Sequence, residues 1–111
     1  MDDGKVNLMR RLHQEGFKIA CVTNSIRETA HLMLKRSGVV DYMDCIVTNE
    51  DINNPKPHPE GYIKAMVILN SPPEMAVIVE DSPKGIQAAE MTGAKVVKVL
   101  NATEVNENII L

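Results

Sequence analysis

Residues 77–89 carry the sequence Val77-Ile78-Val79-Glu80-Asp81-Ser82-Pro83-Lys84-Gly85-Ile86-Gln87-Ala88-Ala89. A short apolar run ends there in two adjacent carboxylates, and a helical pattern begins after the proline. This order predicts a buried strand, a tight turn and a helix. Open α/β sheets place their ligands at the carboxyl ends of such strands. Glu80 and Asp81 are therefore candidate ligands of a hard divalent cation such as Mg²⁺, which prefers oxygen donors.

The rest of the chain repeats this alternation of short apolar runs and helical patterns. Such alternation predicts an α/β fold of the three-layer Rossmann-like type, with a parallel sheet and helices on both faces. A length of 111 residues fits a single domain, 1–111. The predicted strands are residues 18–22, 45–47, 75–79 and 95–99, and the predicted helices are about 6–14, 25–37, 59–69 and 83–92.

Two serines stand where helices are expected to begin. Ser25-Ile26-Arg27-Glu28 has the S-x-x-E form of a capping box, which predicts a helix start at Ser25. Ser82 precedes the helix after the carboxylate pair, so we expect it to be an N-cap, with a catalytic role as the alternative. The tail from Asn101 is weakly patterned.

Composition excludes several classes of protein. The net charge is -3 and no basic stripe is present, which argues against nucleic acid as a partner. Cys21 and Cys45 form no C-x-x-C motif, and we expect core thiols in a reducing compartment. No apolar stretch approaches the roughly 18 residues of a membrane span, and no signal peptide opens the sequence. These features favour a cytoplasmic protein without a membrane partner.

Polar residues with phosphate and metal chemistry stand at three strand ends or just beyond them. Thr23 and Asn24 end one strand, Lys56 lies in a proline-rich loop after the next, and Glu80-Asp81 end the third. The carboxyl ends of parallel strands meet at one edge of a sheet. A hydroxyl near a helix start can hold phosphate oxygens, and a lysine can offset phosphate charge. Two carboxylates can hold the Mg²⁺ that bridges to phosphate.

Three stretches resemble the second, third and fourth motifs of the haloacid dehalogenase superfamily, in its phosphoglucomutase-like and sugar-phosphatase-like branch. They are Val22-Thr23-Asn24-Ser25, Lys56-Pro57-His58-Pro59 and Val79-Glu80-Asp81-Ser82-Pro83-Lys84-Gly85. The resemblance runs from about Val6 to Val99 and implies Mg²⁺-dependent phosphoryl transfer on a small phosphorylated metabolite through an aspartyl-phosphate.

The resemblance also assigns roles to individual residues. It implies phosphate binding by Thr23, Asn24 and Lys56, catalytic roles for Thr23 and Lys56, and metal binding by Glu80 and Asp81. The family's first motif, an apolar strand ending in Asp-x-Asp, has no counterpart in these 111 residues. Asp2-Asp3-Gly4 follows no apolar strand, so we expect a solvated N-terminus there.

We therefore expect the chain to be the C-terminal part of such a core domain, without its first strand and its cap. We also expect the chain to be inactive alone, because the nucleophile is absent. A non-catalytic pseudoenzyme or an assembly subunit of a split protein is the alternative. An unrelated domain of the receiver type would need an acceptor Asp after the first strand, where Thr23-Asn24 stand instead.

The missing strand would lie between the strands at 18–22 and 75–79. These two strands either close up into direct neighbours or keep an open slot that a partner strand or an N-terminal fragment completes. We expect the slot to be kept, although its unpaired edges favour aggregation.

Overall fold

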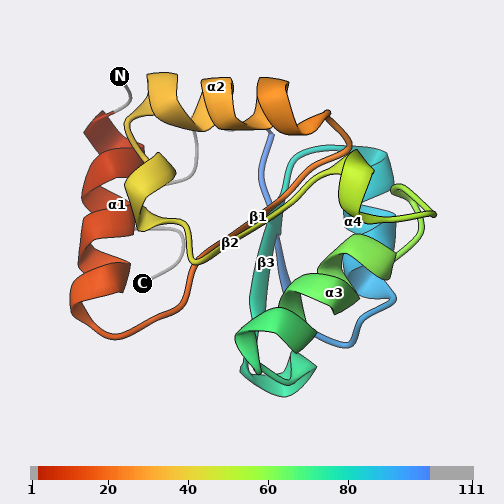
Figure 1. Cartoon of the computed structure of the whole chain (residues 1–111). Coiled ribbons are helices and arrows are strands. Elements are labelled where there is room, and N and C mark those ends of the chain that lie inside the picture. Colours follow the sequence, from red (N-terminus) through yellow and green to blue (C-terminus); the bar gives the residue numbers. More distant parts are fainter. Residues whose placement is uncertain (1–2, 101–111) are drawn as a thin grey trace.

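The computed structural model describes residues 3–100, in which four α-helices alternate with four short strands (Figure 1). This order confirms the predicted alternation. Met1, Asp2 and the weakly patterned tail from Asn101 lie outside the described residues. The elements are α1 (Asp3–Gln14), β1 (Ala20–Val22), α2 (Arg27–Ser37), β2 (Cys45–Val47), α3 (Glu60–Leu69), β3 (Val77–Glu80), α4 (Pro83–Glu90) and β4 (Lys95–Lys98), with 3-10 turns η1 (Val40–Tyr42), η2 (Asn49–Asp51) and η3 (Pro73–Met75).

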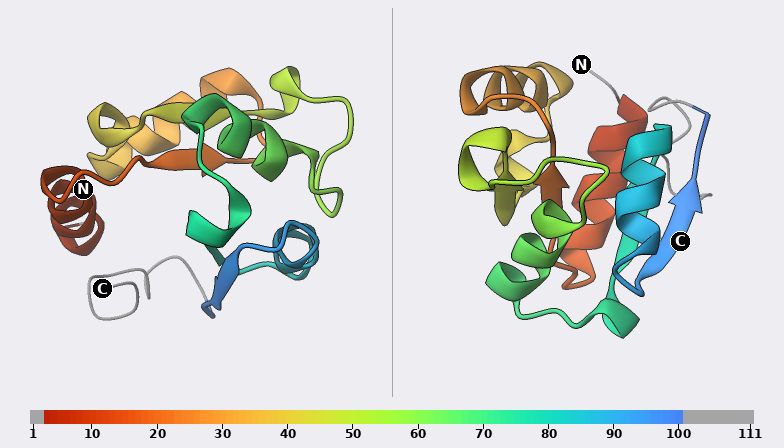
Figure 2. Two further views of the ribbon diagram at one scale, coloured as in Figure 1. Left: turned by 90° about the horizontal axis from the view of Figure 1, so that it is seen from below. Right: turned by 90° about the vertical axis from the view of Figure 1, so that its right-hand side faces the viewer.

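The strands form two separate parallel pairs. β1 pairs with β2, with Cys21 opposite Ile46, and β3 pairs with β4, with Val79 opposite Val97. Within residues 3–100 no ladder joins β1 to β3. Both views of Figure 2 show the two pairs apart. A closed four-stranded sheet therefore does not form, and the expectation that β1 and β3 stay separate is confirmed.

Helices α3 and α4 bring the two strand pairs together. α3 packs against β1 and β2, α4 packs against β3 and β4, and the two helices contact each other. Figure 1 shows α1 on the opposite side of the strands from both. Gly61 permits the close packing of α3, because a Cβ there would lie 2.8 Å from Cγ1 of Val22. This approach places the loop before α3, which contains Lys56, beside the carboxyl end of β1.

Three apolar clusters make up the core of the described residues. Their buried members are Tyr62, Ile78, Ala88 and Ala89 in the first; Leu8, Leu12 and Ile19 in the second; and Cys45, Val47 and Ala65 in the third. Both cysteines are free thiols, Cys45 buried and Cys21 half-buried, and burial raises the pKa of each. No helix in the described part of the chain combines the length and apolar character needed to cross a bilayer.

The start of α2 differs from the prediction. The helix begins at Arg27, and the preceding Ile26 makes no side-chain cap. Glu50 supplies the cap instead, since its Oε2 accepts a hydrogen bond from the Arg27 backbone N–H at 2.6 Å. The predicted capping box at Ser25 was wrong, because a carboxylate from η2 takes over this role. The capping box that does form joins Thr48 and Asp51.

Candidate active site

The side chain of Lys56 connects the carboxyl ends of the two strand pairs. Its Nζ donates hydrogen bonds to Oε2 of Glu80 at 2.6 Å and to the Val22 carbonyl at 2.9 Å. The Thr23 N–H donates to Val47 in β2, so the Val22 carbonyl points to the opposite edge of β1. Lys56 therefore spans the open position between β1 and β3. The Lys56 and Glu80 side chains are 14% and 8% exposed, so this ion pair is largely shielded from water.

Glu80 is the centre of the hydrogen-bond network. Besides Lys56, its carboxylate accepts from the Tyr62 hydroxyl, from the Asp81 N–H at 3.2 Å and from the Ser82 hydroxyl at 3.4 Å. Burial acts to raise the pKa of Glu80, but the hydrogen bonds from Lys56 and Tyr62 and the Lys56 charge outweigh it, and the pKa is lowered. Glu80 is thus held as an ionised group.

The absence of a side chain at Gly85 makes room for Glu80. A Cβ at Gly85 would lie 2.0 Å from Cδ of Glu80, far inside van der Waals contact. The Gly85 N–H also donates to Oγ of Ser82 at 3.1 Å, which makes Ser82 the N-cap of α4. The expectation for Ser82 is confirmed.

Asn24 and Thr23 stabilise the backbone around the site. Oδ1 of Asn24 accepts from the Lys56 N–H at 3.1 Å, and its amide group donates to the Lys56 carbonyl at 3.5 Å. Asn24 therefore fixes the loop that carries the lysine. Oγ1 of Thr23 accepts from the Ser25 N–H at 3.1 Å, which uses an oxygen lone pair and leaves the hydroxyl proton for another acceptor.

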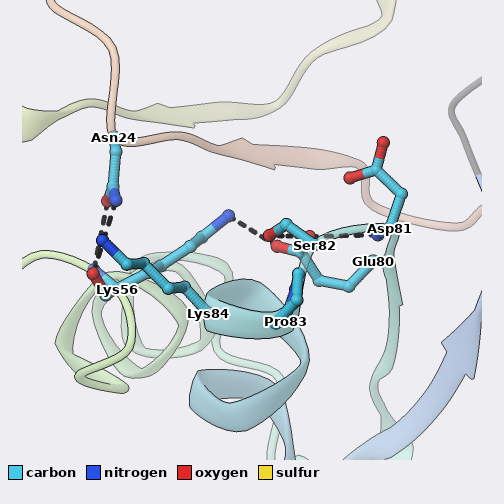
Figure 3. A pocket seen from close by; sticks show the side chains of 7 residues that line it. All are labelled: Asn24, Lys56, Glu80, Asp81, Ser82, Pro83 and Lys84. Atoms are coloured by element: carbon cyan, nitrogen blue, oxygen red, sulfur yellow. Dashed lines mark hydrogen bonds and ion pairs between the residues drawn. The ribbon is translucent and has the colours of Figure 1, made fainter.

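Four of the five predicted site residues line one pocket of about 510 Å³ (Figure 3). Thr23 precedes Asn24 in the sequence but does not line the pocket. The Asp81 carboxylate points away from the Lys56–Glu80 pair, and no hydrogen bond or ion pair within residues 3–100 holds it. The lining residues are Asn24, Lys56, Glu80, Asp81, Ser82, Pro83 and Lys84.

The carboxylates suit a magnesium ion only in part. Within residues 3–100 no three His, Cys, Asp or Glu side chains cluster as a ready-made metal site. Mg²⁺ is commonly bound by one or two carboxylates, with water and substrate phosphate completing its shell. Asp81 fits this requirement, because it is exposed at the end of β3 and its oxygens are available. The Glu80 oxygens already serve Lys56 and Tyr62.

Sequence reasoning missed Tyr62 and the role of Gly85. Both contact Glu80, from two different helices that lie far from it in the sequence or across a turn, so no local pattern indicates these contacts. Lys56 lies in the proline-rich loop and Tyr62 lies six residues later in α3, so their spacing in the sequence does not indicate a contact. Only the packing of α3 against β3 and α4 brings the Tyr62 ring under the lysine.

Comparison with known proteins identifies the family of the chain. The sequence pattern of the haloacid dehalogenase-like hydrolases fits residues 3–99. The chain belongs to this family. Similar proteins include a pyrophosphatase, PpaX, of Halalkalibacterium halodurans, 39% identical over 93 residues that cover 84% of this chain and 43% of the relative. Another is the validoxylamine A 7'-phosphate phosphatase of Streptomyces hygroscopicus subsp. limoneus, 36% identical over 82% of this chain and 43% of that protein.

Solved structures of the family have the same fold. A phosphatase from Thermococcus onnurineus has a TM-score of 0.82 at 27% identity, covering 96% of this chain and 50% of the other. A β-phosphoglucomutase from Clostridium difficile has a TM-score of 0.77 at 28% identity, covering 88% and 43%. The chain thus spans less than half the length of these curated relatives and matches part of their Rossmann-like core. Haloacid dehalogenase-like hydrolases generally depend on Mg²⁺.

Proposed function

We propose that this chain, as a single partial core domain over residues 1–111, supplies the phosphate and metal groups of a Mg²⁺-dependent phosphohydrolase or phosphomutase. The observation that supports this most is the position of Lys56, bonded at once to the end of β1 and to Glu80 at the end of β3. A cation fixed between two strand ends, beside an available carboxylate, suits a phosphate ester with a bound metal ion.

Each residue has a distinct task in this proposal. Lys56 offsets the charge of the phosphate, and Asn24 fixes the Lys56 backbone through two hydrogen bonds. The free proton of the Thr23 hydroxyl is available to a phosphate oxygen. Glu80 orients the Lys56 ammonium group, while Asp81 holds Mg²⁺. When bound, the ion neutralises phosphate oxygens during transfer.

The nucleophile has to come from outside the residues that line the pocket. The 111-residue sequence contains no Asp-x-Asp, and in the family mechanism a carboxylate oxygen attacks phosphorus as the ester P–O bond breaks. We place that carboxylate on a strand between β1 and β3, facing the Val22 carbonyl edge. The chain alone then binds phosphate without turning over an ester. The phosphatase names of the relatives support a small phosphorylated substrate.

Binding and turnover test the proposal separately. We expect inorganic phosphate with Mg²⁺ to shift the amide NMR signals of Asn24, Lys56 and Asp81 in the full chain. Asp81→Asn should abolish the Mg²⁺-dependent part, whereas Asp41→Asn, an exposed control in η1, should not. Shifts absent at millimolar phosphate and Mg²⁺ would refute the binding role. Mg²⁺-dependent hydrolysis of p-nitrophenyl phosphate by the wild-type chain, lost in Asp81→Asn, would refute the predicted inactivity.

Among the described residues, the edges of β1 and β3 that face each other are unpaired, which supports a second candidate, a non-catalytic assembly subunit. Co-expression with a relative's segment that carries an apolar strand ending in Asp-x-Asp distinguishes the two. A complex on gel filtration that hydrolyses p-nitrophenyl phosphate supports the enzyme. A stable complex that stays inert supports the assembly subunit.

A further inference from the structure

We infer that Tyr62 is a positioning residue that fixes the Lys56 ammonium group at the open end of the site. The Lys56 Nζ lies 4.9 Å from the centroid of the Tyr62 ring. The Tyr62 hydroxyl donates to Oε2 of Glu80, the same oxygen that accepts from Lys56. Lysine, phenol and carboxylate thus form a closed triangle, in which one tyrosine holds the cation by its ring and the anion by its hydroxyl.

The tyrosine is a rigid support for this triangle. It is 7% exposed, lies in the first turn of α3 and packs into a cluster with Ile78, Ala88 and Ala89. A lysine side chain has four flexible bonds and loses much rotamer entropy when it is ordered. Contact with an aromatic face adds attraction along the side of the ammonium group that the carboxylate does not cover. The ring therefore restricts sideways movement of the Lys56 ammonium group, which the hydrogen bond to Glu80 alone would allow.

The protonation of the phenol fixes the direction of its hydrogen bond. Burial raises the pKa of Tyr62, and the hydrogen bond to Glu80 raises it further. The Tyr62 phenol therefore stays the donor and the Glu80 carboxylate stays the acceptor throughout the physiological pH range. Oε1 of Glu80 remains for the Asp81 N–H and the Ser82 hydroxyl, so the Tyr62 hydroxyl does not compete with the turn that starts α4.

The chain contains a matched control for this role. Tyr42 is the only other tyrosine; it lies in η1, beside His13 at a ring-centroid distance of 6.0 Å. Its half-buried ring packs in the cluster of Leu8 and Leu12, apart from the site. The inference rests on the proposed function only where it treats Lys56 as a phosphate-binding group.

Reactivity of the lysines in the full chain tests the inference. Trace acetylation at fixed neutral pH, read by peptide mass spectrometry, gives a rate for each lysine of the same molecule. Lys56 should be the slowest in the wild type. Tyr62→Phe should raise its rate several-fold, and Tyr62→Leu further, while Lys64 keeps its rate and Tyr42→Phe changes neither. An unchanged Lys56 rate in both Tyr62 variants would overturn the inference, because a tyrosine that only fills the core does not control Lys56 selectively.

A wild-type measurement keeps the inference testable if the variants do not fold. The Tyr62 hydroxyl proton should be visible by NMR, protected from exchange, with cross-relaxation to the Lys56 methylenes. The absence of a protected signal would overturn the inference. Neither experiment contains phosphate or Mg²⁺, so a chain that fails to bind phosphate can still support the Tyr62 role, and the reverse also holds.

Discussion

Replacement of Lys56 by methionine isolates the ion pair at the centre of the site. Methionine keeps much of the apolar stem but removes the ammonium group, so the Glu80 carboxylate stays buried without a cation. The Lys56 and Glu80 side chains are only 14% and 8% exposed, so water can screen the unpaired Glu80 charge only weakly. Removing one partner of a buried pair costs about 3–5 kcal/mol of folding free energy. The Val22 carbonyl also loses its donor, which adds to the cost unless water replaces it.

Urea unfolding of Lys56→Met and Lys84→Met provides the comparison. Lys84 lines the same pocket but is exposed and makes no hydrogen bond or ion pair with Glu80, so its replacement should stay within about 0.5 kcal/mol of the wild type. With a urea slope of about 1–3 kcal/mol per molar, Lys56→Met should move the midpoint down by roughly 2 M. The double variant Lys56→Met/Glu80→Gln should recover a large part of the loss, because no buried charge remains.

Acidification gives an independent check on the same variant. Without Lys56, Glu80 loses a hydrogen bond and a charge that lower its pKa while burial still raises it, so its folded pKa should lie higher than in the wild type. The loss of unfolding free energy in Lys56→Met, relative to the wild type, should then shrink as pH falls and Glu80 takes up a proton. A Lys56→Met chain no less stable than Lys84→Met, at neutral pH and with a two-state transition, would refute the buried-pair reasoning.

Two further predictions concern the surroundings of the pair. Gly85→Ala should lower the free energy of unfolding by about 1–3 kcal/mol, because the new methyl displaces the Glu80 carboxylate; urea unfolding within error of the wild type would contradict the close approach. The lowered pKa of Glu80 stabilises the fold above its unfolded pKa of about 4.3, and this contribution is lost as pH falls through the folded pKa. Wild type should therefore lose stability more steeply than Glu80→Gln below about pH 4, and parallel urea profiles at pH 6, 4 and 3 would contradict it.

The order of elements was predictable because it depends on local signals. Apolar runs mark the strands, and Gly38, with φ of 80°, ends α2 as a left-handed C-cap. Strand ends were less predictable. The strand expected at 18–22 begins only at Ala20, because the Ile19 N–H donates to Oδ2 of Asp44 instead of joining a ladder. That partner lies 25 residues away, beyond the reach of a local pattern.

The meeting of Asn24, Lys56 and Glu80 was predictable from one rule, that parallel strands place their carboxyl ends at one edge. The contribution of each residue was not. Glu80 was expected as a metal ligand, yet its oxygens orient Lys56, and its role toward Mg²⁺ stays a prediction. The cap of α2 came from Glu50 and not from Ser25, for the same reason that Tyr62 was missed: tertiary packing decides which donor reaches which acceptor.

The three separate apolar clusters have a consequence for how the molecule opens. Val22 packs against two of them, and α3 contributes Tyr62 to one and Ala65 to the other, so these clusters are coupled through one helix and one strand end. The cluster of α1, built on Leu8, shares no residue with either. We therefore expect α1 to open locally at a lower free-energy cost than α3, and its amides to exchange with solvent well before those of α3. On this reasoning, the part of the chain that carries the site should stay closed longest.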